Sequence, residues 1–447
     1  MLVEREPNET LMGTARSFGN GAQKAVALPE WFGKHSPRMT RGWRIILALA
    51  LALGGIRGAL AQIDPTRREL VQLGYNQPIE GRGPLAAYGF YYLNRPDFLQ
   101  QSNLTLRLAV APVYLDSELG IRRALGPHTD LGLGLAGGGF ADSYSEVRRG
   151  KYEKEESFLG HSAEISSSVY HLFDPASRVP LYGIVRGAVH YSVYARDTST
   201  EDSFELPDDQ LFFNVRAGFR FGGREPVMMP ELAMELSAWY EGEFRAHPNR
   251  YGYSDDRPVQ AYAHSFWARA LLNYTTPDWK HNFAVSVTGG SGVNLDRFSA
   301  YRMGGNLPLG AEFPLALPGY YYQELSTTAF TLFGGQYNLP LDSRQRFLAN
   351  LTVASAWVDY LDGLRQPGNW HTGIGGGFVF RSPSESWLIA IGYGYGVNAI
   401  RDDERGAHSV LFLLQFDWGR TRQRLFHPDE GVGRTRGLDA ILKNIFR

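Results

Sequence analysis

The sequence of 447 residues contains no cysteine, and its formal net charge is only −1. The absence of cysteine is typical of an oxidising compartment, where stray thiols would mispair. A balanced charge argues against a nucleic-acid partner and against a basic patch that binds a membrane surface. Helical periodicity is also absent between Ala86 and Trp418, so we do not expect helices over most of the chain.

The start of the chain has the three-part layout of a secretory signal. Residues 39–44 (MTRGWR) are basic, residues 45–55 are apolar, and Ala59 and Ala61 place small side chains before Gln62. The apolar run is too short to span a bilayer well, although a buried or membrane-anchoring helix is the alternative interpretation. We predict an over-extended or disordered leader at 1–38, a signal peptide at 39–61, and a mature chain that begins near Gln62.

What the rest of the chain does have is alternation of apolar and polar residues. In the segment 211–221, for example, Leu211, Phe213 and Phe219 alternate with Asn214 and Arg216. Successive side chains of a strand face opposite sides, so such a segment has one apolar and one polar face. Strands of soluble sandwiches run about five or six residues. The segments here are longer and carry arginine and glutamate on the polar face, which is typical of transmembrane barrels.

Fifteen segments alternate in this way: 86–93, 104–114, 119–125, 131–144, 158–173, 181–195, 211–221, 232–246, 262–275, 281–289, 329–341, 348–358, 372–380, 387–397 and 409–418. Both ends of such a barrel should lie in the periplasm, which requires an even number of strands. We therefore predict an all-β fold, a transmembrane antiparallel β barrel of 16 strands at 86–418, with one strand missed or split. A short periplasmic lead (62–85) would precede it, and a basic tail (419–447), spaced for a short helix, would follow.

The connections between these segments differ in length. Segments 142–157, 196–210 and 245–260 are long and charged, whereas 174–180, 277–281 and 381–386 are short. Long loops outside and short turns in the periplasm are expected of outer-membrane barrels. The connection at about 290–326 is too broken by glycine and proline for a strand, and too aromatic and apolar for a solvated loop. We predict that this long extracellular loop is held by an enclosing structure.

Five motifs in the last third of the chain occur in a recognisable order. They are Tyr301-Arg302-Met303-Gly304-Gly305, Leu317-Pro318-Gly319-Tyr320, Tyr337-Asn338-Leu339-Pro340-Leu341, Trp357-Val358-Asp359, and Gly373-Ile374-Gly375 with Ser382-Pro383. Together they resemble the bacterial surface antigen superfamily of outer-membrane barrels, which includes BamA-like assembly factors and two-partner-secretion transporters. The resemblance implies that the loop carrying the first two motifs lies in the lumen.

In that family an arginine at the loop tip meets the strand aspartate inside the barrel. Here Pro318 stands in the place of the arginine. The resemblance therefore implies another partner for Asp359, either one of the tyrosines 320–322 or Arg302. The alternative is that Asp359 is an ordinary lumen-facing or strand-end carboxylate.

The glycines of these motifs, Gly304, Gly305 and Gly319, also have two interpretations. They serve either close packing in the lumen or turns with positive φ.

The last alternating segment, 409–418, ends in aromatic residues. This resembles the assembly signal of outer-membrane proteins. We expect Phe412, Phe416 and Trp418 to lie on the strand that would form a lateral seam with the first strand.

No constellation of residues predicts catalysis, a cofactor or a metal. His161 and Ser162 are adjacent, and adjacent residues of a strand point to opposite faces. His190 and Ser192 share a face, but it is the polar face, which points to the lumen. No cluster has metal-ligand spacing. We expect a protein that is not an enzyme, and a lipolytic outer-membrane enzyme is the least favoured alternative.

We predict a non-enzymatic role in protein or lipid translocation or assembly in the outer membrane of a Gram-negative bacterium. The expected partners are outer-membrane lipids and a periplasmic or lipoprotein partner, because 62–85 is too short for a client-receiving module. The alternative is a passive diffusion porin or a structural scaffold barrel, since lumen-facing charges suit a wet pore. Those charges are Arg186, Arg216, Arg220, Glu235, Glu241, Glu243, Arg245 and Arg269.

Overall fold

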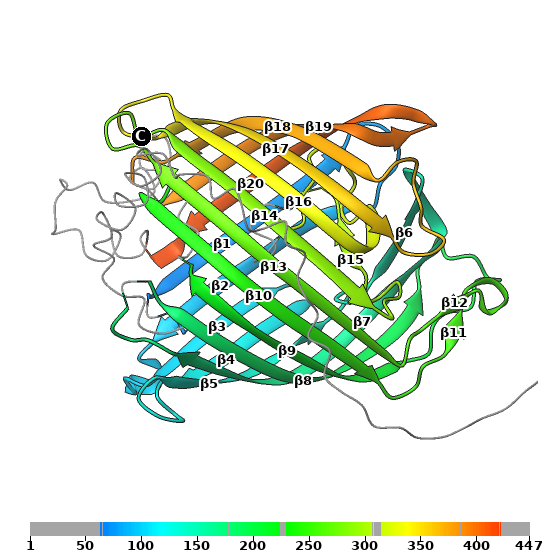
Figure 1. The fold of residues 1–447 in the computed structure, drawn as a ribbon, viewed down its shortest axis with the longest axis horizontal. Coiled ribbons are helices and arrows are strands. Elements are labelled where there is room, and N and C mark those ends of the chain that lie inside the picture. The colour runs from blue at the N-terminus through cyan, green and yellow to red at the C-terminus, as the bar shows by residue number, and fades with distance from the viewer. Residues whose placement is uncertain are drawn as a thin grey trace, which may run out of the picture. The chain divides into compact units, whose positions relative to one another are not determined.

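The computed structural model describes residues 63–419 and 421, except for 65, 178, 224–228, 306, 308–313 and 385. The predicted leader (1–38), signal peptide (39–61) and nearly all of the tail (419–447) lie outside these residues. Within them, one sheet has 18 strands, and 16 of these close into an antiparallel barrel (Figure 1). No helix in the described part of the chain is long and apolar enough to cross a membrane.

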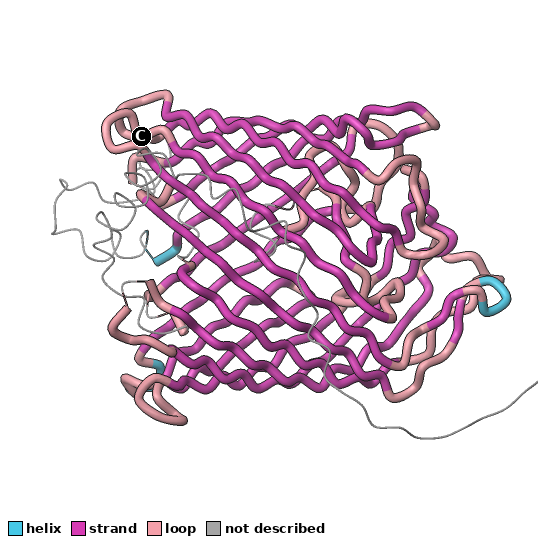
Figure 2. Tube along the Cα trace, viewed as in Figure 1, coloured by secondary structure: helices cyan, strands magenta, loops and turns pink. Residues whose placement is uncertain are grey.

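The wall strands follow one another in sequence order, and each is hydrogen-bonded to the next (Figures 1 and 2). They are β1 (Arg68–Pro78), β2 (Ala86–Pro96), β3 (Leu104–Ala111), β4 (Tyr114–Ile121), β5 (Thr129–Gly138), β7 (Lys151–Leu172), β8 (Leu181–Arg196), β9 (Gln210–Gly222), β10 (Leu232–Arg245), β13 (Tyr262–Thr275), β14 (Asn282–Val293), β16 (Leu325–Pro340), β17 (Phe347–Tyr360), β18 (Trp370–Arg381), β19 (Trp387–Arg401) and β20 (Glu404–Asp417).

Four shorter strands lie in the connections. β6 (Tyr144–Arg148) pairs with β7, β15 (Tyr301–Met303) pairs with β16, and β11 (Arg250–Tyr251) pairs with β12 (Arg257–Pro258) in a small separate sheet. The described residues also include two 3-10 turns, η2 (Phe98–Gln100) and η3 (Tyr253–Asp255).

The strand that alternation did not reveal is β1, which lies in the segment expected to be a periplasmic lead. It pairs with β2 on one side and with β20 on the other, and so closes the barrel. The barrel therefore begins at Arg68 rather than at Ala86. The polar residues of this strand that are buried on its inner face, Gln72 and Asn76, made the segment resemble a solvated lead.

The predicted faces of the strands are confirmed. On β8, Val185 and Val189 are exposed on the outer face, whereas Ile184 and Ala188 are buried on the inner face. An apolar exterior around a polar or packed interior is the reverse of a soluble protein, and it fits a wall that faces lipid.

Long loops and short turns lie at opposite ends of the barrel (Figure 1). The long connections follow β5, β8 and β10, and the short ones follow β7, β13 and β18. Because neighbouring strands are antiparallel, these two sets cannot share an end; we call them the loop end and the turn end. One connection at the loop end is tight: β3 and β4 are separated only by Pro112 and Val113, where the sequence had suggested strands at 104–114 and 119–125.

Gln72 on β1 and Gln415 on β20 face each other across the closing ladder, with 2.8 Å between their Nε2 and Oε1 atoms. We expect the double variant Gln72→Cys/Gln415→Cys to form a disulfide on mild oxidation, because opposed residues of antiparallel strands lie within disulfide range. The native chain has no cysteine, so a shift on a non-reducing gel has no background. Gln72→Cys with Leu411→Cys, further along the same inner face, should remain reduced. Equal oxidation of both pairs would contradict the closed ladder.

Candidate functional site

The connection between β14 and β16, residues 294–324, packs against the inner face of the wall; we call it the inner loop. Its root is fixed by Asp296, whose carboxylate forms a buried ion pair with Arg245 at the end of β10 (Nη1 to Oδ2, 2.6 Å). The other carboxylate oxygen accepts hydrogen bonds from the backbone N–H groups of Phe298 and Ser299. A charged carboxylate with several donors holds the start of the loop in one position.

Two glycines let the outgoing and returning arms of the inner loop touch. The N–H of Gly305 donates to the carbonyl of Tyr321 (2.8 Å), and the N–H of Leu317 donates to that of Gly304 (2.6 Å). A Cβ on Gly304 would overlap the carbonyl of Tyr321, and one on Gly305 would crowd that of Tyr320. Neither glycine has a positive φ. The structure thus supports the packing interpretation over the turn interpretation.

The tip of the inner loop rests on a glycine patch on the inner face of β18 and β19. The patch consists of three directly opposed pairs, Gly373–Gly396, Gly375–Gly394 and Gly377–Gly392. A Cβ on Gly373 would overlap Pro318, and one on Gly394 would lie 3.1 Å from the Cβ of Pro318.

Beside Pro318, Gly319 has a φ of 84° and lies directly against Gly396. Here a glycine is required both by its backbone conformation and by the close approach. Pro318, which stands where the family has arginine, is therefore held by close packing. The wall residues beneath it are glycines, so the loop tip rests directly on the backbone of β18 and β19.

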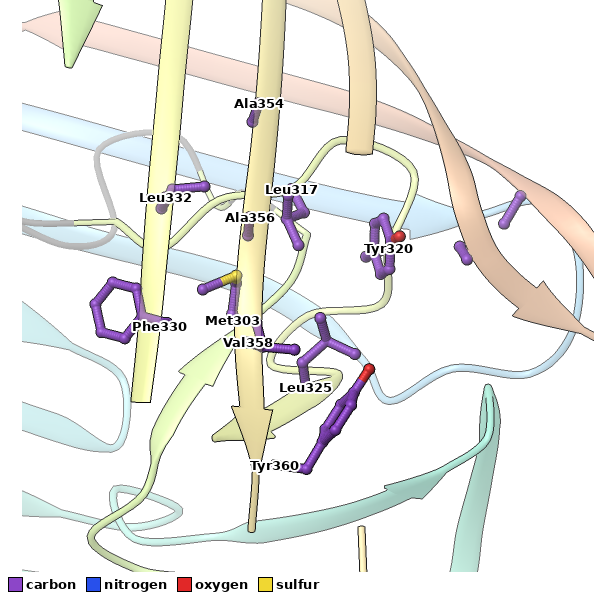
Figure 3. Close-up of a cluster of buried hydrophobic side chains, with 12 residues drawn as sticks. Met303, Leu317, Tyr320, Leu325, Phe330, Leu332, Ala354, Ala356, Val358 and Tyr360 are labelled. Atoms are coloured by element: carbon purple, nitrogen blue, oxygen red, sulfur yellow. The ribbon is translucent and has the colours of Figure 1, made fainter. Parts of the chain in front are cut away.

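Apolar side chains around the tip form a buried cluster (Figure 3). Leu317 and Tyr320 of the inner loop are fully buried against Leu332 of β16 and against Ala356 and Val358 of β17. These wall residues all lie on inner faces, and the sequence places small or branched side chains there instead of the charges found on β8 to β10. The inner loop is consequently packed on one side of the barrel interior.

Tyr320 also makes the tip's main polar contact. Burial, and next the Glu324 carboxylate, raises the pKa of Tyr320, so its hydroxyl stays protonated. The hydroxyl lies 3.0 Å from Nδ1 of the buried His371, whose Nε2 contacts the hydroxyl of Tyr360. Tyr360 in turn donates to the carbonyl of Gly368 (2.8 Å). This network assigns a neutral imidazole that accepts from Tyr320 and donates to Tyr360.

The returning arm is held by a buried ion pair between Glu324 and Arg401 at the end of β19. Its two contacts are 3.0 Å (Nη1 to Oε1) and 2.8 Å (Nη2 to Oε2). Glu324 also accepts the N–H of Tyr321, and the guanidinium of Arg401 lies 3.5 Å from the centroid of the Tyr321 ring. The polarity is the reverse of that implied by the family resemblance, since here the loop supplies the acid and the strand supplies the arginine.

Asp359 takes no part in this site. Its side chain is exposed, because Val358 and Tyr360, its neighbours on β17, are the residues that point inward. The implied contact with the tyrosines of the loop or with Arg302 is therefore not formed. Arg302 instead donates to the carbonyl of Ser145 (2.6 Å), which ties the inner loop to β6.

The residues expected at the seam lie on or just after β20. Phe412 is opposite Tyr75 of β1 and Phe416 is opposite Val71, with the Phe416 and Trp418 ring centroids 5.7 Å apart. The seam between β1 and β20 is a continuous ladder in this structure.

The opposite side of the interior carries paired charges. Arg186 pairs with Glu164 (2.5 Å), Arg216 with Glu241 (3.1 Å) and Arg220 with Glu235 (3.2 Å). These residues confirm that the polar faces of β8, β9 and β10 point inward.

His190 and Ser192, the pair considered for catalysis, both contact Asp142. The serine hydroxyl donates to that carboxylate and not to the imidazole, so a base that activates a nucleophile is not assembled. Among the described residues, no group of side chains could hold a metal ion.

The sequence did not predict the roles of three residues that hold the inner loop: Glu324, Arg401 and His371. Glu324 and Arg401 are 77 residues apart, and neither stands in a family motif. Arg401 carried one weak signal: it is the only charged residue of β19 and stands at the end of that strand.

A closed, 16-stranded antiparallel barrel with an apolar exterior is the architecture of an outer-membrane β barrel. No protein-family model and no curated protein matches the sequence. Among solved structures, the chain is similar to CdiB from Acinetobacter baumannii, with 12% identity and a TM-score of 0.52 over 79% of this chain and 60% of that chain.

The chain is also similar to CdiB from Escherichia coli, with 10% identity and a TM-score of 0.51 over 79% of this chain and 64% of that chain. BamA from Haemophilus ducreyi lacking POTRA domains 1-3 gives 11% identity and a TM-score of 0.49 over 78% and 70%. The chain spans less than two thirds of the CdiB chains. At these identities the likeness shows a shared fold.

The Glu324–Arg401 pair should be strongly coupled. Glu324→Ala or Arg401→Ala leaves one buried charge without its partner, which we expect to lower the free energy of unfolding by about 3–5 kcal/mol. The double variant should cost clearly less than the sum of the two. Urea unfolding in detergent micelles, followed by tryptophan fluorescence, measures each value. Asp359→Ala, at an exposed position, should change stability by less than about 0.5 kcal/mol. Additive effects of the first two substitutions would contradict the coupling.

Proposed function

We propose that the protein has a non-enzymatic role in protein or lipid translocation or assembly in the outer membrane of a Gram-negative bacterium, as a barrel of the surface antigen superfamily. The order of its five motifs and the similarity of its fold to CdiB support this assignment. We further propose that it works with outer-membrane lipids and with a periplasmic or lipoprotein partner.

The observation that carries the proposal is that the inner loop touches both sides of the β1–β20 seam. On one side Tyr321 stacks on Arg401 of β19. On the other, its hydroxyl lies 3.3 Å from the carbonyl of Glu80 and its ring fills the space beside Gly81 and Gly83, in the connection after β1. Glu80 also accepts the N–H of His408 on β20 (2.6 Å).

A loop in this position cannot move without disturbing the residues that flank the seam. An inner loop that only narrowed a pore would need no contact with the seam. The arrangement therefore supports a role in which the state of the wall and the state of the inner loop change together.

Depletion of the protein, followed by a quantitative outer-membrane proteome and lipid analysis, tests the role. We expect a defined set of other barrels or a lipid species to fall several-fold, and the wild-type gene to restore it. Arg401→Ala should restore it only partly, whereas Asp359→Ala should restore it fully. An unchanged outer membrane after depletion would sink the proposal. A pull-down from outer membranes would identify the partner.

A passive diffusion porin is the second candidate, and the paired charges on β8, β9 and β10 favour it. Planar-bilayer recording separates the two. If the inner loop keeps the interior closed, the wild-type protein should conduct weakly, and deletion of residues 305–322 should raise the conductance several-fold. Large, stable and solute-selective conductance from the wild type would favour the porin.

A further inference from the structure

The hairpin formed by β6 and the start of β7 extends beyond the wall at the loop end. The ladder between β5 and β7 ends at Ser162, and the ladder between β7 and β8 ends at Phe158, whereas β7 itself begins at Lys151. β6 pairs with this extension of β7. We call residues 144–157 the crossbar.

The crossbar has an irregular ladder close to the point where it leaves the wall. Tyr144 is opposite Phe158. Two residues later Glu146 is already opposite Glu153, so β7 carries the extra residues of a bulge. Ser157 closes this bulge, because its hydroxyl donates to the carbonyl of Glu153 (2.7 Å) and accepts the N–H of Glu146 (3.1 Å). Bulges bend a strand, and these hydrogen bonds hold the bend in place.

The tip of the crossbar touches the far side of the barrel. Arg149 and Gly150 form a two-residue turn in which both φ angles are positive, 49° and 78°, as tight hairpins favour. Gly150 is buried, and a Cβ there would overlap the carbonyl oxygen of Ile400 on β19. Eight wall strands separate β7 from β19 in one direction and six in the other, so the crossbar spans the mouth of the barrel (Figure 1).

The tip also lies at the ion pair that holds the returning arm of the inner loop. The carbonyl of Ile400 that Gly150 contacts accepts a hydrogen bond from Nη1 of Arg401 (2.6 Å), and the same nitrogen contacts Glu324. A Cβ on Gly150 would lie 3.3 Å from this nitrogen. A displacement of the tip would therefore change the surroundings of the ion pair.

Along its length the crossbar contacts the outgoing arm of the inner loop. The carboxylate of the fully buried Glu146 accepts hydrogen bonds from Nε (3.2 Å) and Nη2 (3.3 Å) of Arg297. Arg302, which donates to the carbonyl of Ser145, also places its guanidinium 4.7 Å from the centroid of the Tyr144 ring. The crossbar is thus attached to the outgoing arm and lies against the wall residue that holds the returning arm.

We propose that the crossbar is a latch for the inner loop. It keeps the loop in the lumen while its tip lies against β19, and it must lift before the loop can leave through the loop end. Arg149 is exposed, and the side chain of Lys151 is 74% exposed, so the latch can be reached from solvent without entry into the barrel. The latch goes beyond the proposed function, since it would act in a translocation barrel and in a porin alike.

Thiol labelling measures how often the inner loop leaves its place. The native chain has no cysteine, so Leu317→Cys, at a fully buried position of the loop, provides a single reporter for N-ethylmaleimide. Gly150→Asn displaces the tip, because its Cβ cannot fit beside the carbonyl of Ile400, although asparagine tolerates a positive φ. Gly368→Asn is the matched control, with a φ of 88° and no described atom within 4 Å of its Cβ.

In detergent micelles, we expect Gly150→Asn to make the reporter react about tenfold faster, because labelling of a buried thiol follows the population of the open form. Gly368→Asn should leave the rate within about twofold of the reporter alone. An unchanged rate with Gly150→Asn would overturn the latch. A second reporter, Leu348→Cys, is fully buried toward the turn end of β17 and should not respond. Equal acceleration there would mean that the whole barrel loosens, which also contradicts a latch.

A shortened crossbar decides the case if Gly150→Asn does not fold, as judged by heat-modifiability on a gel. Deletion of residues 147–148 and 151–152 removes two cross-strand pairs and keeps the turn. It withdraws the tip by about 7 Å, since each residue of a strand spans about 3.3 Å. The reporter at 317 should accelerate about tenfold here too, and the one at 348 should not. A rate at 317 equal to that of the intact crossbar would overturn the latch and leave the proposed translocation or assembly role untouched.

Discussion

The structure depends on one constraint, the pairing of backbone hydrogen-bonding groups in a wall that faces lipid. A spanning strand with a free edge would leave N–H and C=O groups without partners, so the sheet must close on itself. The chain meets this requirement through the β1–β20 ladder. Closure also creates an interior, and the composition of that interior decides what the inner loop can do. One side carries paired charges, and the other carries glycine and small apolar residues that leave room for a packed loop.

The inner loop is attached at three points, by two buried ion pairs and one region of close packing. Its root is held by the Asp296–Arg245 ion pair, its tip by close packing on the glycine patch, and its returning arm by the Glu324–Arg401 ion pair. Buried ion pairs add less net stability than their geometry suggests, because both charges lose their hydration. Their clearer effect is to make alternative positions of the loop costly, since each would leave a buried charge without its partner.

Alternation alone located fifteen of the wall strands and assigned their faces, because lipid outside and a polar interior impose a period of two. It missed β1, where only three apolar side chains (Val71, Leu73 and Tyr75) alternate with Gln72, Gly74 and Asn76, in a short segment between charged and turn-forming residues. The resemblance to a family located the inner loop and its glycines, yet it placed Asp359 inward. Its neighbours Val358 and Tyr360 face inward, so the side chain of Asp359 faces outward, because successive residues of a strand point to opposite faces. The Glu324–Arg401 pair could not be predicted, because only the three-dimensional path of the loop brings the two residues together.

The glycine patch has a consequence for how the barrel responds to its surroundings. A contact formed by shape between Pro318 and bare backbone involves no charge, so salt neither screens nor strengthens it. The tip should therefore keep its place across wide changes in ionic strength, while exposed charges of the long loops adjust to them. The protein thus combines salt-sensitive loops and interior charge pairs with one salt-indifferent contact at the tip of the inner loop.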